Sequence, residues 1–193
     1  MNAAVELFRS VGYQKTMIID ITKSAGAAKG TFYHYFPTKE AVLEAICHSW
    51  ATETATSFKR ENRHLAALPK LQLFIADLFL PNELNLLFKR LWDEDQLNLY
   101  YKAWRNLVEA VFNSLLTDII RQGIQEETMH VACPEEATAF FWSTLHCVWE
   151  AIFFQDPPEL IDTKVKTAES LLERVLGIEE SILKISLATY RLA

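Results

Sequence analysis

Apolar residues recur at helical spacing along most of this chain, and turn-forming residues separate the helical stretches. The first example lies near the N-terminus, where Ala4, Leu7, Phe8 and Val11 follow the i, i+3, i+4, i+7 spacing of one helix face. Gly12 comes directly afterwards and is a typical stop signal for a helix. The pattern therefore predicts a short amphipathic first helix.

Two further short helices are expected before residue 38. Thr16 can cap a helix that ends at Gly26, and Pro37 ends a third short helix over residues 29–35. Thr38 can then cap a long fourth helix that reaches about residue 65. Three short helices with tight turns between them are typical of a helix-turn-helix core.

The remainder of the chain is also predicted to be helical. Residues 93–125 are expected to form one long helix, and residues 163–177 carry a single apolar stripe. Residues 135–154 are apolar on more than one face, and such a helix must be buried on both sides. Residues 178–193 fit either a tenth helix or a tail.

The absence of any β pattern predicts an all-α fold of about nine or ten helices. We expect an N-terminal three-helix helix-turn-helix domain over residues 1–46 and a larger helical domain over residues 47–193. Half of the 193 residues are hydrophobic and 23% are charged, which provides ample material for a packed core.

The net charge of −6 is unevenly distributed. Residues 1–50 hold five basic and four acidic side chains, whereas the remainder holds 14 basic and 21 acidic ones. The excess acid therefore lies outside the N-terminal segment, which is free to approach a polyanion.

Cysteine usage and hydropathy indicate the expected compartment. Cys47, Cys133 and Cys147 are far apart and form no CxxC pair, as expected in a reducing environment. Glu6 and Arg9 interrupt the apolar N-terminus, so it does not resemble a signal peptide, and no uncharged apolar run reaches about 18 residues. We expect a soluble, cytoplasmic protein without a membrane partner.

Metal and enzyme interpretations have little support. His130 with Cys133, and His146 with Cys147 and Glu150, could each supply ligands, but adjacent residues point in different directions on a helix. There is no glycine-rich phosphate loop and no GxSxG or HExxH motif. An all-α enzyme that uses an aromatic pocket is the weaker alternative, and we expect no cofactor, no metal and no catalytic residue.

The stretch from Ala4 to Ala45 resembles the DNA-binding domain of the TetR (tetracycline-repressor) family. The resemblance covers about a quarter of the chain closely, whereas the rest agrees only in length, helix count and apolar character. The matching residues are Leu7, Phe8, Gly12, Tyr13, Thr16, Asp20, Ile21, Ala25, Gly26, Lys29, Gly30, Thr31, Tyr33, His34, Tyr35, Phe36, Lys39, Glu40 and Ala41.

In a helix-turn-helix, the second helix of the pair enters the major groove, so residues 29–35 are the predicted recognition helix. Gly30 allows a close backbone approach to DNA. The side chains expected at the groove are those of Lys29, Thr31, Tyr33 and His34, and those expected to contact phosphate are Thr16, Tyr35 and Lys39. The alternative is that the aromatic run 33–36 packs this domain onto the body.

For the body, the resemblance implies an apolar effector pocket and a dimer interface made by the last two long helices. The effector is expected to be a small hydrophobic molecule, and aromatic side chains are dense there. The predicted effector-binding residues are Phe88, Trp92, Tyr100, Tyr101, Trp104, Phe141, Leu145, His146 and Trp149. The predicted interface residues are Phe140, Cys147, Ala151, Phe154, Ala168, Leu172 and Val175.

These expectations describe a homodimeric transcriptional regulator, most often a repressor, that binds a pseudo-palindromic operator on double-stranded DNA and is released by its effector. Two residues depart from the family pattern, namely the outward-facing Ile19 and Ala28 at the start of the recognition helix. The alternative function is therefore a helical ligand- or partner-binding module with weakened DNA binding.

Overall fold

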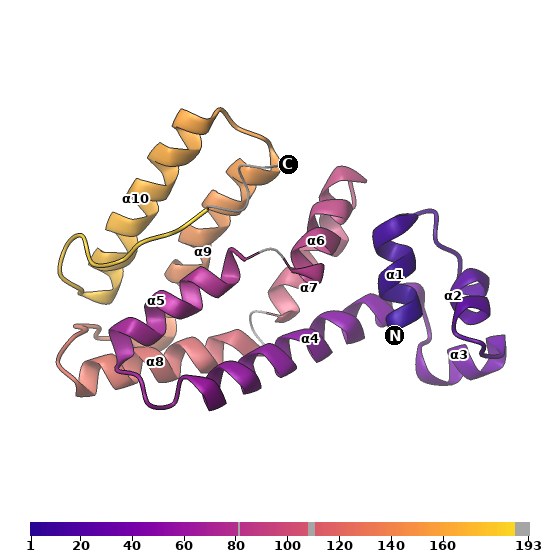
Figure 1. The fold of residues 1–193 in the computed structure, drawn as a ribbon, viewed down its shortest axis with the longest axis horizontal. Coiled ribbons are helices and arrows are strands. Elements are labelled where there is room, and N and C mark those ends of the chain that lie inside the picture. Colours follow the sequence, from indigo (N-terminus) through magenta and orange to yellow (C-terminus); the bar gives the residue numbers. More distant parts are fainter. Residues whose placement is uncertain (81, 108–110, 188–193) are drawn as a thin grey trace. The chain divides into compact units, whose positions relative to one another are not determined.

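A computed structural model describes residues 1–80, 82–107 and 111–187, and throughout these ranges the regular elements are helices (Figure 1). The all-α prediction is confirmed. The helices are α1 (Asn2–Ser10), α2 (Ile18–Ser24), α3 (Lys29–Tyr35), α4 (Lys39–Glu61), α5 (Ala67–Leu78), α6 (Glu83–Asp93), α7 (Leu97–Leu107), α8 (Asn113–Gln125), α9 (Pro134–Phe153) and α10 (Pro158–Leu176).

The chain divides into two compact units, and α4 contributes to both. The N-terminal unit comprises Met1–Thr54 and Asn82–Val111, and the C-terminal unit comprises Ala55–Pro81 and Phe112–Ala193. The N-terminal unit thus holds the three short helices together with α6 and α7. The functional boundary expected at residue 46 stays a prediction.

In the N-terminal unit, α1 packs against α2 and α6, and α6 packs against α7 (Figure 1). Phe8, Leu43, Leu91 and Tyr100 are among its fully buried side chains. Removing each such side chain from water stabilises the fold by about 1.5–3 kcal/mol. This core holds the short helices in place without help from a disulfide, since Cys47, Cys133 and Cys147 are free thiols.

Two predicted helix caps have different outcomes. The Thr38 hydroxyl accepts the backbone N–H of Ala41 at 3.0 Å, which confirms the cap predicted for the long fourth helix. The predicted cap at Thr16 is wrong, because α2 begins at Ile18 with Met17 as its N-cap. The Asp20 carboxylate accepts the Met17 N–H at 3.2 Å and so satisfies one backbone donor at the start of α2.

The single long helix predicted over residues 93–125 is also wrong. α6 ends at Asp93 and α7 begins at Leu97, and Asp95 between them has a φ of 55°. The N–H of Gln96 donates to the Leu91 carbonyl at 2.8 Å, which closes the helix end around a left-handed residue. Residues 108–110 of the predicted helix lie outside the described residues.

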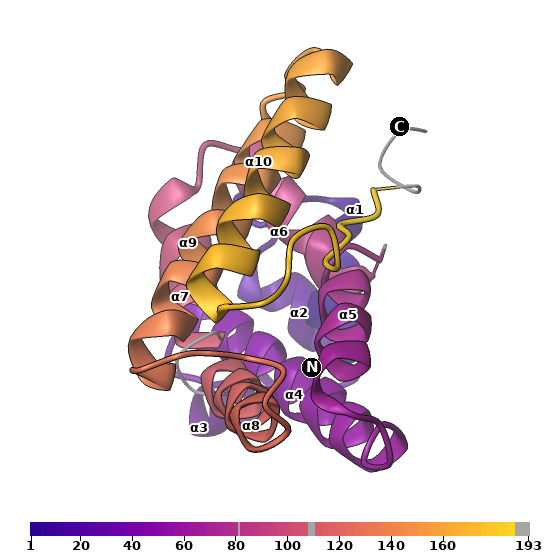
Figure 2. The same cartoon turned by 90° about the vertical axis from the view of Figure 1, so that its left-hand side faces the viewer.

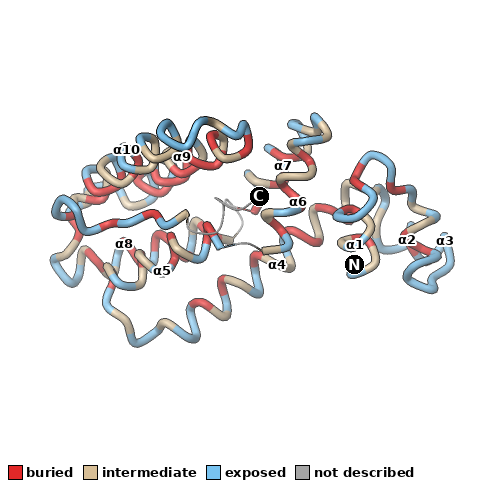
Figure 3. Tube along the Cα trace, turned by 45° about the horizontal axis from the view of Figure 1, so that its top comes forward, coloured by how far each residue is buried: buried red, intermediate tan, exposed pale blue. Residues whose placement is uncertain are grey.

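In the C-terminal unit, α9 and α10 lie side by side, and α8 packs against both α5 and α9 (Figures 1 and 2). Buried residues line the inner faces of these helices, and exposed residues line their outer faces (Figure 3). Phe74 stands at the centre of an aromatic cluster, with ring centroids 5.7 Å from Phe58, 5.9 Å from Phe112 and 5.9 Å from Trp142.

Residues 178–187, which were predicted to form either a helix or a tail, form an irregular strap along α5 and α10 (Figure 2). Gln72 of α5 brackets Lys184, since its side-chain amide donates to the Lys184 carbonyl and accepts the Lys184 N–H. Glu173 and Glu169 of α10 accept the backbone N–H groups of Leu183 and Ile185. Residues 188–193 lie outside the described part of the chain.

No single helix within the described ranges is long and apolar enough to cross a membrane, and α5 with α6 would meet that criterion only as a bent pair.

Candidate nucleic-acid interface

The predicted recognition helix α3 is held to the N-terminal unit by one buried side chain. Phe32 is buried, whereas the other six residues of α3 are exposed. Ile21 and Thr22 are the buried residues of the preceding helix, and the Thr22 carbonyl accepts the N–H of Ala27 at 2.9 Å across the turn. The pair α2–α3 therefore presents nearly all of α3 to the surroundings.

The exposed surface of α3 combines a cation with aromatic hydrogen-bonding groups. Tyr33 is 46% exposed and Tyr35 is 69% exposed. The Lys29 ammonium lies 5.9 Å from the centre of the Tyr33 ring, and the rings of His34 and Tyr35 are 5.0 Å apart. The side chains of Tyr33, His34 and Tyr35 are accessible within the N-terminal unit.

The surroundings of Gly30 differ from those of Thr31 and Tyr35. A Cβ atom added at Gly30 would meet nothing within 4 Å, so the backbone here is open to a close approach. Thr31 and Tyr35, one turn apart, border a pocket of about 150 Å³ that is lined mainly by apolar side chains, among them Ile21, Phe32 and Val42.

The structure shows internal hydrogen bonds for two of the residues predicted to contact phosphate. Thr16 is buried, and its hydroxyl donates to the Gly12 carbonyl at 2.6 Å. The ammonium of Lys39 donates to the carbonyls of Tyr13 and Thr16 at 2.6 and 2.9 Å. Burial lowers the pKa of the Lys39 ammonium below its ordinary value, and the nearby Glu94 carboxylate opposes that shift. Phosphate contact by either residue stays a prediction.

Side chains from α6 hold the same turn between α1 and α2. Glu94 accepts the backbone N–H of Gln14, and Arg90 donates to the Val11 carbonyl at 3.3 Å while pairing with Glu94 at 2.9 Å. Sequence reasoning missed Arg90 and Glu94, because their partners lie about 80 positions away and no local spacing reveals them.

Lys102 of α7 pairs with two of the four acidic residues in the N-terminal fifty. Its ammonium lies 2.7 Å from a carboxylate oxygen of Glu40 and 2.7 Å from one of Glu44. The hydrogen bond to Glu40, followed by that to Glu44, raises the pKa of Lys102 above its ordinary value. Lys102 thus neutralises charge on α4 that would oppose a polyanion, a role that no sequence motif indicated.

Known proteins resemble this chain both in sequence and in fold. A sequence model of bacterial regulatory proteins of the tetR family matches residues 1–46. The crystal structure of the transcriptional regulator FadR from Bacillus subtilis in complex with stearoyl-CoA superposes with a TM-score of 0.65 at 22% identity, over 92% of this chain and 97% of that one. Residues 1–46 thus match the TetR family, and the fold is similar to that of FadR.

Two relatives of this chain come from Bacillus subtilis (strain 168). Its HTH-type transcriptional regulator YvdT is 42% identical over 59 residues, which is 31% of this chain and 30% of that protein. Its fatty acid metabolism regulator protein is 30% identical over 128 residues, which is 65% of this chain and 66% of that protein. These alignments therefore span less than two thirds of either relative.

The nine predicted effector-binding residues fall in both units. Those of the N-terminal unit form one aromatic cluster around Tyr100, whose ring centroid is 5.5 Å from Phe88, 5.4 Å from Trp92 and 5.1 Å from Tyr101. Trp104 joins the cluster through Phe88, at 6.0 Å.

The other predicted effector residues belong to the C-terminal unit. Phe141, Leu145 and Trp149 are buried there, and Trp149 stacks on Phe79 with the ring centroids 4.8 Å apart. His146 is half-buried, and burial lowers the pKa of its imidazole, while Glu150 one turn away opposes the shift. Effector contact stays a prediction for all nine residues.

The predicted dimer-interface residues separate into two groups. Phe140 of α9 and Phe154, its C-cap residue, are 63% and 65% exposed, and Cys147 between them is exposed too, so a stripe with a seven-residue repeat faces outward. Ala151, Ala168 and Leu172 are instead buried within their own chain. Interface contact stays a prediction for all seven residues. Val175 is half-buried.

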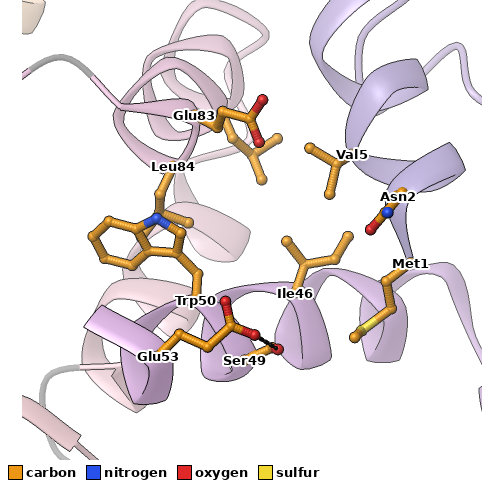
Figure 4. Close-up of a pocket in the computed structure, with 10 residues that line it drawn as sticks. Met1, Asn2, Val5, Ile46, Ser49, Trp50, Glu53, Glu83 and Leu84 are labelled. Carbon is orange, nitrogen blue, oxygen red and sulfur yellow. Dashed lines mark hydrogen bonds between the residues drawn. The ribbon is translucent and has the colours of Figure 1, made fainter. Parts of the chain in front are cut away.

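A separate pocket of about 150 Å³ lies between α1, α4 and α6 in the N-terminal unit (Figure 4). Val5, Ile46 and Leu84 supply apolar walls, and the carboxylates of Glu53 and Glu83 stand at opposite sides (Figure 4). None of the predicted effector-binding residues lines it. No group of three or more potential metal ligands occurs among the described residues.

Proposed function

We propose that this chain is a DNA-binding transcriptional regulator that binds a pseudo-palindromic operator as a homodimer. The observation that carries the proposal is α3, a short helix anchored by Phe32 whose remaining side chains are all exposed, within the stretch that matches the family model. Phosphate contacts orient such a helix, whereas contacts to base edges specify the sequence.

The chemistry of α3 supports a division of roles. Lys29 and His34 offer N–H donors for base edges or phosphates, and Tyr33 adds a phenolic hydroxyl. Thr31 supplies a hydroxyl and a methyl group, and Gly30 lets the backbone come close to DNA. Tyr35 is the most exposed aromatic residue of the helix and suits a phosphate contact.

The outer face of α9 supports a homodimer. Phe140, Cys147 and Phe154 recur every seven residues, which is the spacing of a helix-pairing seam. Leu160 and Leu171 of α10 are further exposed apolar side chains. A two-fold dimer built on these helices would place two copies of α3 on half-sites about one helical turn apart.

The proposed effector is a long-chain acyl coenzyme A thioester or a related apolar acyl compound. Two similarities support this class, namely the similarity to a fatty acid metabolism regulator protein and the fold similarity to FadR in complex with stearoyl-CoA. Ligand would release the operator by favouring a dimer conformation whose spacing no longer matches the half-sites, which corresponds to repression.

The first experiment is selection of bound duplexes from a random DNA pool by the purified protein at about 100 mM salt. Recovery of a two-fold symmetric site supports the proposal and supplies the operator. Stearoyl-CoA and free coenzyme A are then titrated into the operator complex. Release by the acyl form alone supports the effector class, and release by both or by neither argues against it.

A second candidate function is a ligand- or partner-binding module with weakened DNA binding. Ile19 is 40% exposed on α2, and Ala28 gives α3 no side-chain cap. A threonine, serine or aspartate cap is worth about 1 kcal/mol to a helix. Failure of the selection to return any specific duplex, combined with binding of stearoyl-CoA to the purified protein, would favour this second function.

A further inference from the structure

The ammonium of Lys39 is surrounded by the backbone of the turn between α1 and α2. It donates to the carbonyls of Tyr13 at 2.6 Å, Thr16 at 2.9 Å and Gln14 at 3.3 Å. The centre of the Tyr13 ring lies 4.4 Å from the same nitrogen. The Lys39 side chain, in the first turn of α4, thus contacts the carbonyls of three residues that lie 23 to 26 positions earlier in the chain.

A lysine ammonium has three N–H donors and no acceptor. All three donors are directed at backbone carbonyls, so a phosphate could be bound only if at least one of these hydrogen bonds were given up. A positive charge in the first turn of a helix is also unfavourable beside the helix dipole. The carbonyls of the α1–α2 turn compensate for this unfavourable position of the Lys39 charge.

We propose that Lys39 is a positioning residue that fixes the α1–α2 turn, and through it the pair α2–α3, and that it does not contact DNA phosphate. The turn carries α2, whose Thr22 carbonyl in turn accepts the N–H of Ala27 just before α3. Loosening the turn therefore loosens the support of the recognition helix. The expected effect on operator binding rests on the proposed function, whereas the hydrogen bonds of Lys39 to the turn are tested without DNA.

The DNA-free test is reductive methylation of the wild-type protein with formaldehyde, followed by peptide mass spectrometry. Lys29 of α3 is exposed and serves as the internal control. We expect Lys39 to react at least about tenfold more slowly than Lys29, because its nitrogen is engaged in charge-assisted hydrogen bonds. Equal rates would overturn the proposal. Since no variant is needed, the test is independent of whether variants fold.

The DNA test uses Lys39→Arg, Lys39→Met and, as the matched phosphate-contact control, Lys29→Gln. An arginine binds phosphate at least as well as a lysine, but its planar fork does not fit carbonyls arranged around a compact ammonium. We therefore expect both Lys39 variants to lose about tenfold or more in operator affinity. Retention of affinity by Lys39→Arg would overturn the proposal.

Salt dependence provides the second readout. Loss of one phosphate contact lowers the slope of log affinity against log salt by about 0.9. We expect this change for Lys29→Gln and an unchanged slope for Lys39→Met, and a lowered slope for Lys39→Met would count against the proposal. If the wild type bound no DNA at all, the proposed function would fail while the methylation result would still decide whether the turn holds Lys39.

Discussion

The carboxylate of Glu94 accepts the backbone N–H of Gln14 at 3.1 Å, although the two residues are 80 positions apart. The same carboxylate binds Arg90, which also reaches the Val11 carbonyl. The last turn of α6 therefore holds the segment that joins α1 to α2 from one side, and Lys39 of α4 holds it from the other.

Replacing Glu94 should loosen this turn without unfolding the chain. Glu94→Ala removes the acceptor for the Gln14 N–H, so we expect faster amide exchange in residues 11–17, measured by hydrogen–deuterium exchange, and weaker operator binding. Glu94→Gln keeps an acceptor oxygen and should have a smaller effect. The control is Asp93→Ala, which removes the adjacent carboxylate that pairs with Lys89. An identical exchange increase in the control would contradict the prediction.

Gly12 should tolerate alanine much less well than Gly26 does. Both have positive φ values, 101° and 63°, which L-residues adopt only with strain. A Cβ at Gly12 would in addition overlap the Glu94 carboxylate, whereas a Cβ at Gly26 meets nothing within 4 Å. We expect Gly12→Ala to lower the free energy of unfolding by about 1–3 kcal/mol and Gly26→Ala by less. Urea titration of both variants measures the difference, and equal losses would contradict the overlap.

Gly30→Ala should raise the stability of the protein and weaken its binding to DNA. Alanine is favoured over glycine inside a helix by about 0.8–1 kcal/mol, and there is open space for its methyl group. We therefore expect a higher melting temperature together with weaker operator binding, because the methyl group would lie where DNA approaches. Unchanged affinity would show that the backbone at Gly30 does not come close to DNA.

Phe154→Glu should dissociate the proposed dimer. A buried, unpaired carboxylate at the interface is strongly unfavourable, so sedimentation velocity should show a monomer where the wild type sediments as a dimer. Leu73→Glu is the matched control, because Leu73 is an exposed leucine on α5. A dimer that survives the change at Phe154 but not the one at Leu73 would place the interface elsewhere.

His146 should make stability depend on pH on the acidic side of neutrality. Burial lowers the pKa of its imidazole in the folded protein below the ordinary value of 6.5. The unfolded chain therefore binds the proton more readily, and the stabilising effect present above about pH 6.5 is lost as the pH falls through the lowered pKa. We expect His146→Gln to flatten the stability profile below that pH in urea titrations, and an unchanged slope in the variant would contradict the prediction.

The helices and the candidate recognition helix could be predicted from local patterns, because each depends on side chains a few positions apart. The α3 bounds and the Thr38 cap are of this kind. The break after α6 could not be predicted in this way. It depends on a left-handed conformation at Asp95, and no glycine or proline marks this helix end in the sequence.

Hydrogen bonds between segments that are distant in the sequence could not be predicted from local spacing. Lys39 is predicted to contact phosphate, and no local spacing reveals that the carbonyls of a turn 23 or more positions away accept its N–H groups. The same holds for Lys102, whose acidic partner Glu40 is 62 positions distant. Which charges meet is decided by tertiary packing, and no spacing in one helix encodes it.

The strap over residues 178–187 has a consequence for the order in which the protein is made. Gln72 leaves the ribosome 112 residues before Lys184, which supplies both of its backbone partners. Every residue of the N-terminal unit precedes the strap in the chain, so that unit can fold during synthesis. The C-terminal unit has to hold α5 and α10 without their tether until residues 178–187 have been synthesised.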